Sequence, residues 1–345
     1  MPRSNRGTRR FVRCAGKPPF PITPWAYAAS RFSPCLRGFQ GDSIALGQWH
    51  CRRLGVAPAR RRADIKNPVS GLAKRVATAV VLVPLVVWGV LALPTAYFGL
   101  ALAAFVLTGA WEWADLSGYR RTAGVAYVLA VIAVLAVLWK FVASPTAVMM
   151  IFAAALLWWL GALVWVIRYQ GGGVTLWMDL KSVRIFVGLL VLAPTWAAML
   201  ALRGTTGVGA ELVLLLLVLV WGADTGAYFA GRRFGKTKLA SRVSPGKTVE
   251  GVVGGVLLAG CVTAGYALIR PQAAGPAAGL FALGIVTALA SVLGDLTESL
   301  VKRRAGRKDS GVLIPGHGGV LDRIDSLTAA APVFALGVVL LGRTH

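Results

Sequence analysis

Charged residues and cysteine are both scarce in this chain of 345 residues. Only 14% of the residues are charged and 57% are hydrophobic, whereas soluble domains carry about 25% charged residues. The mean hydropathy of +0.68 is that of a membrane protein. The four cysteines, at positions 14, 35, 51 and 261, form no CxxC pair, so neither a zinc site nor a disulfide framework is indicated. The composition predicts an all-α, multi-pass membrane protein.

Acidic residues are also few, with 13 Asp and Glu against 37 Lys and Arg and a net charge of +24. In a soluble protein this charge would suggest nucleic acid as a partner. Here 16 of the bases precede residue 76, and most of the others cluster in two loops beside apolar runs. Such clusters follow the positive-inside rule and attract anionic headgroups. We therefore expect membrane lipids as partners, and no nucleic acid.

Residues 1–66 lack an apolar run long enough for a secretory signal peptide. They are rich in Arg and Pro, and we predict a disordered basic extension. Two interpretations remain open: an organellar transit peptide, or an extension upstream of the working start. The first places the protein in an organellar membrane. We favour the bacterial inner membrane, because the region of transmembrane helices begins abruptly at about residue 67 and the extension before it looks unselected.

Nine apolar stretches follow, each about as long as a helix that crosses some 30 Å of hydrocarbon. They are 76–93, 95–111, 124–142, 146–167, 185–202, 208–230, 249–269, 275–298 and 326–342. With the N-terminus in the cytoplasm, the connections outside hold only two bases, Arg203 and Arg270, and those inside hold many. This asymmetry supports a cytoplasmic N-terminus.

The nine spans divide into two regions of different character. Residues 67–214 form N-terminal transmembrane helices with short connections. Residues 215–345 form a transmembrane region that carries two polar cytoplasmic loops and the candidate catalytic residues.

The first polar block, 221–251, contains Gly-Lys-Thr at 235–237 and again at 246–248. Neither triplet has the glycine that a P-loop needs five positions before its GK glycine, so a P-loop is excluded. A flexible loop with Ser244 and Lys247 can still offer donors and positive charge to a phosphate. The alternative is a basic anchor with turn glycines.

Asp224 interrupts an otherwise apolar span in the same block. A carboxylate costs about 2.5–3.5 kcal/mol near the membrane centre, so such residues are usually functional or paired. A structural ion pair with Arg232 or Arg233 is the alternative.

The second polar block begins inside the eighth span. Asp295, Glu298, Ser299 and Lys302 fall at i, i+3, i+4 and i+7, so a helix places all four on one face. The stripe could equally be a buried ion pair between Glu298 and Lys302.

Acids recur at the far end of this block, where Asp322 and Asp325 would share a face at the start of the last helix. Carboxylates from two helix ends can hold a hard cation, Mg²⁺ above all, with room for a second cation. The alternative is a solvated loop with Asp322 as a helix N-cap. His317 lies among glycines that let a ligand approach, and both phosphate contact and a structural role remain open.

The second block resembles a known signature. It reads SLVKR at 299–303, KDSG at 308–311, LIPGHGGV at 313–320 and LDRID at 321–325, and in this it is similar to the phosphatidate cytidylyltransferases, the CDP-diacylglycerol synthases. The stretches 224–235 and 244–251 look like the family's other polar segment. The resemblance is specific over 215–342 and only compositional over 76–214.

The resemblance implies transfer of the cytidylyl group of CTP to phosphatidate, with Mg²⁺, to give CDP-diacylglycerol and pyrophosphate for phospholipid synthesis. On it we expect Asp295, Lys302, Asp322 and Asp325 to be catalytic, and Asp224, Asp295, Glu298 and Asp322 to bind metal. The expected substrate-binding residues are Ser244, Lys247, Arg303, Lys308, His317 and Arg323. The alternatives are a CTP-dependent polyprenol kinase and an ion-coupled transporter. A homodimer stays open.

Overall fold

The computed structural model of the protein describes residues 68–173, 180–270, 277–311 and 318–342, with side chains from Val80 onward. Lys66–His345 form one compact unit. The helices in the described ranges are α3 (Pro68–Ala92), α4 (Thr95–Leu116), α5 (Arg121–Phe141), α6 (Pro145–Gln170), α7 (Lys181–Gly204), α8 (Gly209–Phe234), α9 (Val249–Ile269), α10 (Ala277–Arg304) and α11 (Leu321–Leu340).

The predicted all-α, multi-pass fold is confirmed. Eight of the described helices, α4 to α11, are long and apolar enough to cross a membrane. They correspond to the second to ninth predicted spans. The first predicted span, 76–93, falls on α3, where an apolar stretch is seen over Val80–Ala92, and its first four residues lie before the described side chains.

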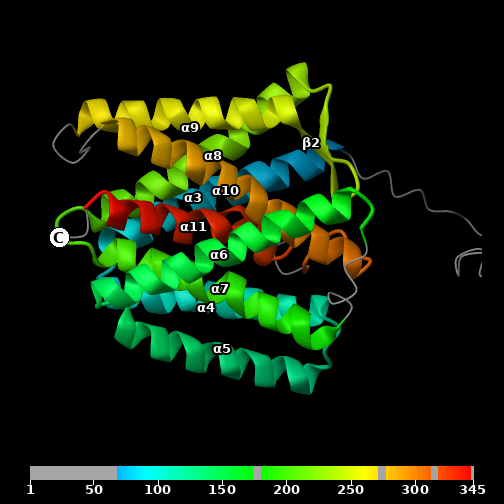
Figure 1. Ribbon diagram of the computed structural model, residues 1–345, viewed down its shortest axis with the longest axis horizontal. Coiled ribbons are helices and arrows are strands. Elements are labelled where there is room, and N and C mark those ends of the chain that lie inside the picture. Colours follow the sequence, from blue (N-terminus) through cyan, green and yellow to red (C-terminus); the bar gives the residue numbers. More distant parts are fainter. Residues whose placement is uncertain (1–67, 174–179, 271–276, 312–317, 343–345) are drawn as a thin grey trace, which may run out of the picture. The chain divides into compact units, whose positions relative to one another are not determined.

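The described helices run in alternating directions, so that the base-rich connections lie at one end of the bundle (Figure 1). A correction concerns the first polar block, which the sequence predicted to be a flexible loop. The structure has an antiparallel hairpin there, formed by β1 (Lys238–Ala240) and β2 (Ser244–Thr248). The hairpin is held by the end of α6, where Gln170 Oε1 accepts from the Arg242 amide at 3.0 Å and Gln170 Nε2 donates to Ser241 Oγ at 2.9 Å.

The helices differ in how deeply they are buried. In the apolar segment of α7, 67% of the residues are buried, and in that of α11 the share is 56%. In α5 and α9 only 22% of the residues of this segment are buried. Figure 1 places α5 and α9 at opposite sides of the described bundle. Large apolar side chains on the outer helices can face lipid at little cost, because lipid tails are as apolar as they are.

Glycines bring the helices of the polar region close together. A Cβ on Gly226 of α8 would lie only 2.6 Å from the carbonyl oxygen of Gly254 in α9. A Cβ on Gly294 of α10 would likewise collide with the carbonyl oxygen of Asp325 in α11. Small residues at such crossings let backbones approach, and the approach draws the carboxylates of α8, α10 and α11 to one end of the bundle.

Candidate active site

A polar cavity of about 710 Å³ lies between α8, α9, α10, α11 and the β2 strand. Both polar blocks of the sequence contribute to it. The acids that line it are Asp224, Asp295, Asp309, Asp322 and Asp325, and the bases are Arg232, Lys247, Lys302 and Arg323. The mixture of five acids and four bases can bind a cation and phosphate groups side by side.

An ion pair joins the two polar blocks inside this cavity. Lys247 Nζ, from β2, lies 2.6 Å from Asp295 Oδ2, from α10. The other oxygen of Asp295 accepts from Ser299 Oγ at 3.2 Å, one helical turn away. Each of the paired side chains keeps about a quarter of its surface exposed, at 24% and 25%. A ligand in the cavity can therefore reach both charges.

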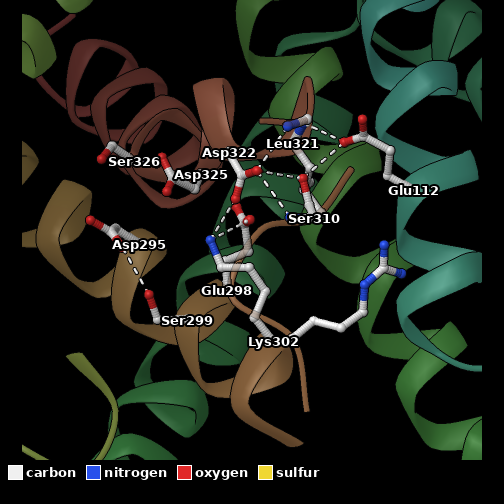
Figure 2. Close-up of polar contacts among 12 residues, drawn as sticks. Glu112, Asp295, Glu298, Ser299, Lys302, Ser310, Leu321, Asp322, Asp325 and Ser326 are labelled. Carbon is white, nitrogen blue, oxygen red and sulfur yellow. Dashed lines mark hydrogen bonds and ion pairs between the residues drawn. The ribbon is translucent and has the colours of Figure 1, made fainter. Parts of the chain in front are cut away.

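Lys302 occupies a more buried position, between two carboxylates. Its ammonium lies 2.7 Å from Asp322 Oδ1 and 3.1 Å from Glu298 Oε1, as Figure 2 shows. All three side chains are at most 9% exposed. The Glu298–Lys302 pair considered from the sequence thus exists, and Lys302 also reaches the far end of the second block.

Asp322 is surrounded by donors. Its Oδ2 accepts from the amides of Ser310 and Gly319, each at 2.9 Å, and from Ser310 Oγ at 3.0 Å. Gly318 has φ +84°, and a Cβ there would come within 2.7 Å of Asp322 Oδ2, so only glycine fits this turn. Asp322 is the second residue of α11, whose N-cap is Val320. The alternative of Asp322 as the N-cap is wrong.

The carboxylates lining the cavity have the chemistry that Mg²⁺ prefers, namely hard oxygen donors. Asp224, Asp295, Asp322 and Asp325 all face it, whereas Glu298 lies behind it beside Trp113 and Trp159. In the described ranges no three acid, His or Cys side chains converge as a ligand set. Asp295 and Asp322 are instead bound to lysines, so a cation would have to displace those contacts.

The predicted substrate-binding residues fall in different places. Lys247 and Arg323 line the cavity, and Ser244 begins β2 without lining it. Arg303 donates to the carbonyl oxygen of Val243 at 3.2 Å and thereby holds the hairpin. The Lys308 side chain, in the connection between α10 and α11, is exposed. His317 lies outside the described residues, so its role stays a prediction.

Two sets of site residues were missed from the sequence. Tyr228, Arg232 and Asp309 line the cavity, and Arg232 donates to the Tyr228 hydroxyl at 2.9 Å. Glu112 of α4, from the N-terminal helices, reaches the loop around Asp322 through Ser310, Val320 and Leu321. Glu112 directly follows the apolar stretch predicted over 95–111, near the end of α4, so it did not stand out as an acid inside an apolar span in the way that Asp224 did.

The chain belongs to the Cytidylyltransferase family, whose pattern it matches over residues 73–341. The phosphatidate cytidylyltransferase of Pseudomonas aeruginosa is 45% identical over 267 residues, which cover 76% of this chain and 96% of that protein. That of Haemophilus influenzae is 37% identical over 284 residues, 76% of this chain and 97% of that protein. That of Brucella melitensis is 35% identical over 279 residues, 78% and 93% of the two chains. The likeness thus extends well beyond 215–342, and the view that it is only compositional over 76–214 was wrong.

Proposed function

We propose that this protein transfers the cytidylyl group of CTP to phosphatidate, giving CDP-diacylglycerol and pyrophosphate. The observation that carries the proposal is the polar cavity, in which Lys247 of one block meets Asp295 of the other at 2.6 Å. It lies at the base-rich end of an apolar bundle, where a lipid phosphate and a water-soluble nucleotide can meet. The names of the relatives over nearly their whole length support the same reaction.

The chemistry that the cavity can perform is an in-line displacement at phosphorus. A phosphate oxygen of phosphatidate bonds to the α-phosphorus of CTP, while the bond from that phosphorus to the oxygen bridging the β-phosphate breaks and pyrophosphate leaves. The attacking phosphomonoester is already anionic, so a strong general base is unnecessary. Rate enhancement then comes from holding the reactants in line and from neutralising the triphosphate. Lys247, Arg232 and Arg323 face the cavity for this task.

Mg²⁺ is part of the proposal, and a second cation is compatible with it. Asp295 and Asp322 would hold the ion, with Asp224 and Asp325 beside them, because these carboxylates line one cavity. When bound, the ion would withdraw charge from the triphosphate oxygens and the leaving pyrophosphate. Lys247 and Lys302, released from Asp295 and Asp322, would turn toward phosphate oxygens.

We place the protein in a bacterial inner membrane, with its N-terminus and the polar cavity on the cytoplasmic side. The asymmetry of bases between the two sides supports this orientation. The acyl chains of the lipid would reach the cavity along α8, where Tyr228 lines the cavity and Phe229 beside it is 65% exposed. The homodimer stays a prediction.

Labelled CTP separates this reaction from that of a polyprenol kinase. Detergent-purified protein is given phosphatidate, dolichol or phytol with CTP labelled at either the α- or the γ-phosphorus. We expect the α-label to enter a lipid product with phosphatidate alone, and the γ-label to leave in pyrophosphate. Transfer of the γ-label to a polyprenol would establish the kinase instead, and absence of any CDP-lipid from phosphatidate would overturn the proposal.

The transporter alternative is not favoured. Transporters tend to bind coupling ions near the bilayer midplane, whereas the acids and bases here gather at the end of the bundle that carries the hairpin.

Metal removal tests the cation. Excess EDTA is expected to reduce CDP-lipid formation to background, because four charges of bound nucleotide would face the cavity acids without a bridging cation. Addition of Mg²⁺ beyond the chelator should restore the rate, and addition of Na⁺ at equal ionic strength serves as the control. Full activity in EDTA would exclude Mg²⁺ from the mechanism.

A further inference from the structure

Glu112 is a buried carboxylate on a helix that neither polar block includes. It lies in α4 and is 6% exposed. Its Oε1 accepts from the Val320 amide at 3.0 Å, and its Oε2 accepts from the Leu321 amide at 2.8 Å and from Ser310 Oγ at 3.0 Å. In Figure 2 the dashed lines reach Glu112 from Leu321 and Ser310, which lie between Glu112 and Asp322. A buried charge of this kind is tolerated only when hydrogen bonds compensate it.

Glu112 supplies the cap that the last helix lacks. Leu321 is the first residue of α11, and the N-cap residue, Val320, makes no side-chain cap hydrogen bond. The first amides of a helix have no partner within it and favour a negative charge. Glu112 accepts hydrogen bonds from the amides of Val320 and Leu321, which lie more than 200 positions later in the sequence. It thus fixes where α11 begins.

The same carboxylate is linked to Asp322 through one hydroxyl group. Ser310 Oγ lies 3.0 Å from Glu112 Oε2 and 3.0 Å from Asp322 Oδ2. Since the hydroxyl carries a single proton, the two carboxylates share it. The Ser310 amide adds a second bond to Asp322 Oδ2 at 2.9 Å. A displacement of the Glu112 carboxylate would therefore disturb Ser310 and its hydrogen bonds to Asp322.

Two described glycines, Gly311 and Gly319, lie close to the Glu112 carboxylate. A Cβ on Gly311 or Gly319 would collide with the Glu112 carboxylate. The backbone at Gly311 and at Gly319 is thus packed against this side chain, and the packing leaves little freedom for Asp322 to turn away from the cavity.

We propose that Glu112 is a positioning residue for cytidylyl transfer, which caps α11 and holds Ser310 so that Asp322 faces Lys302 and the polar cavity. The inference rests on the proposed function. It assigns to the N-terminal helices a part in the reaction, although none of the described residues that line the cavity comes from them. Glu112 itself touches no substrate in this scheme, because its buried carboxylate is taken up by Ser310, Val320 and Leu321.

Glu112→Gln tests the proposal with little change of shape. Glutamine has one oxygen and one NH₂ group in place of two oxygens, and the NH₂ group can only donate. The amide of either Val320 or Leu321 would therefore lose its acceptor, and with it one cap bond. We expect kcat per folded molecule to fall about 10- to 100-fold, as for other residues that orient a catalytic group. KM for CTP should change less than threefold. Amide hydrogen exchange should accelerate over residues 318–323 and stay unchanged in α5 and α9.

Asp115→Asn is the matched control. Asp115 lies three residues along the same helix and forms an ion pair with Arg307, which follows α10, but its side chain is 60% exposed. Its substitution should leave kcat and the exchange of 318–323 unchanged. If Glu112→Gln does not fold, Ser310→Ala tests the link between Glu112 and Asp322, because it removes only the shared hydroxyl. An unchanged kcat in Ser310→Ala would then overturn the positioning role.

The outcomes separate the inference from the proposed function. Full kcat per folded molecule in Glu112→Gln, beside an active wild type, would overturn the positioning role alone. A loss of activity that only follows the loss of folded protein would do the same. A wild-type protein that makes no CDP-lipid would overturn the proposed function, while the exchange of 318–323 would still report whether Glu112 holds the loop.

Discussion

Asp295→Asn is expected to lower the rate of CDP-diacylglycerol formation by on the order of 10²–10³-fold, the loss seen when one group that stabilises charge in a transition state is removed. Asp295 lines the polar cavity and pairs with Lys247 at 2.6 Å. Asparagine keeps the shape but loses the charge, so it can neither hold a cation well nor orient the Lys247 ammonium. Because both side chains are about a quarter exposed, stability should change little.

The measurement is the initial rate with labelled CTP and phosphatidate, normalised to folded protein. Glu211→Gln is a suitable control, since Glu211 forms an ion pair with Arg270, at the end of α8 away from the cavity. Its rate should equal that of the wild type. An Asp295→Asn protein that retains more than a tenth of the activity would remove Asp295 from the essential residues.

The largest expected effect on stability belongs to Lys302→Met. Lys302 lies between Glu298 and Asp322, and all three side chains are at most 9% exposed. In the described part of the chain no donor other than Lys302 reaches either oxygen of Glu298, so Lys302 is its main compensation. Removal of one partner from a buried ion pair leaves an uncompensated charge and costs about 3–5 kcal/mol. The free energy of unfolding in detergent should fall by this amount.

Lys247→Met provides the comparison, because Lys247 also pairs with an aspartate but at 24% exposure. Pairs that remain in contact with solvent contribute only about 0.2–1 kcal/mol. Glu298→Gln added to Lys302→Met should recover part of the lost stability, since it removes one of the two carboxylate charges that Lys302 had compensated. Equal losses for the two lysine variants would show that burial does not decide the strength of these pairs.

Several features of the fold follow from local sequence. The apolar stretch predicted over 249–269 coincides with α9, because the length of a membrane span is set by the thickness of the bilayer and needs no knowledge of neighbours. The ion pair of Glu298 and Lys302, one of the two interpretations that their i, i+4 spacing left open, is present, since residues four apart are neighbours on a helix. The proximity of Asp322 and Asp325 at the start of α11 rests on the same geometry.

Other features depend on how distant helices cross. The spacing of Asp295, Glu298 and Lys302 suggested one common face, but Asp295 turns to Lys247 across the cavity and Lys302 turns to Asp322. Asp295 and Lys302 have different partners because the hairpin carries Lys247 to one of them and the start of α11 carries Asp322 to the other. No periodic pattern in the sequence encodes the position of the hairpin or of α11.

The sequence by itself determined the class of protein, its apolar helices and the location of the two polar blocks, because hydropathy and helical spacing act over a few neighbouring residues. Only the tertiary structure decided that both blocks line one cavity, that β1 and β2 pair, and that Glu112 caps α11. The contacts of Glu112 join residues 208 and 209 positions apart. Such contacts arise from the packing of α4 against the loop and α11, where a buried carboxylate must find donors wherever the fold brings them.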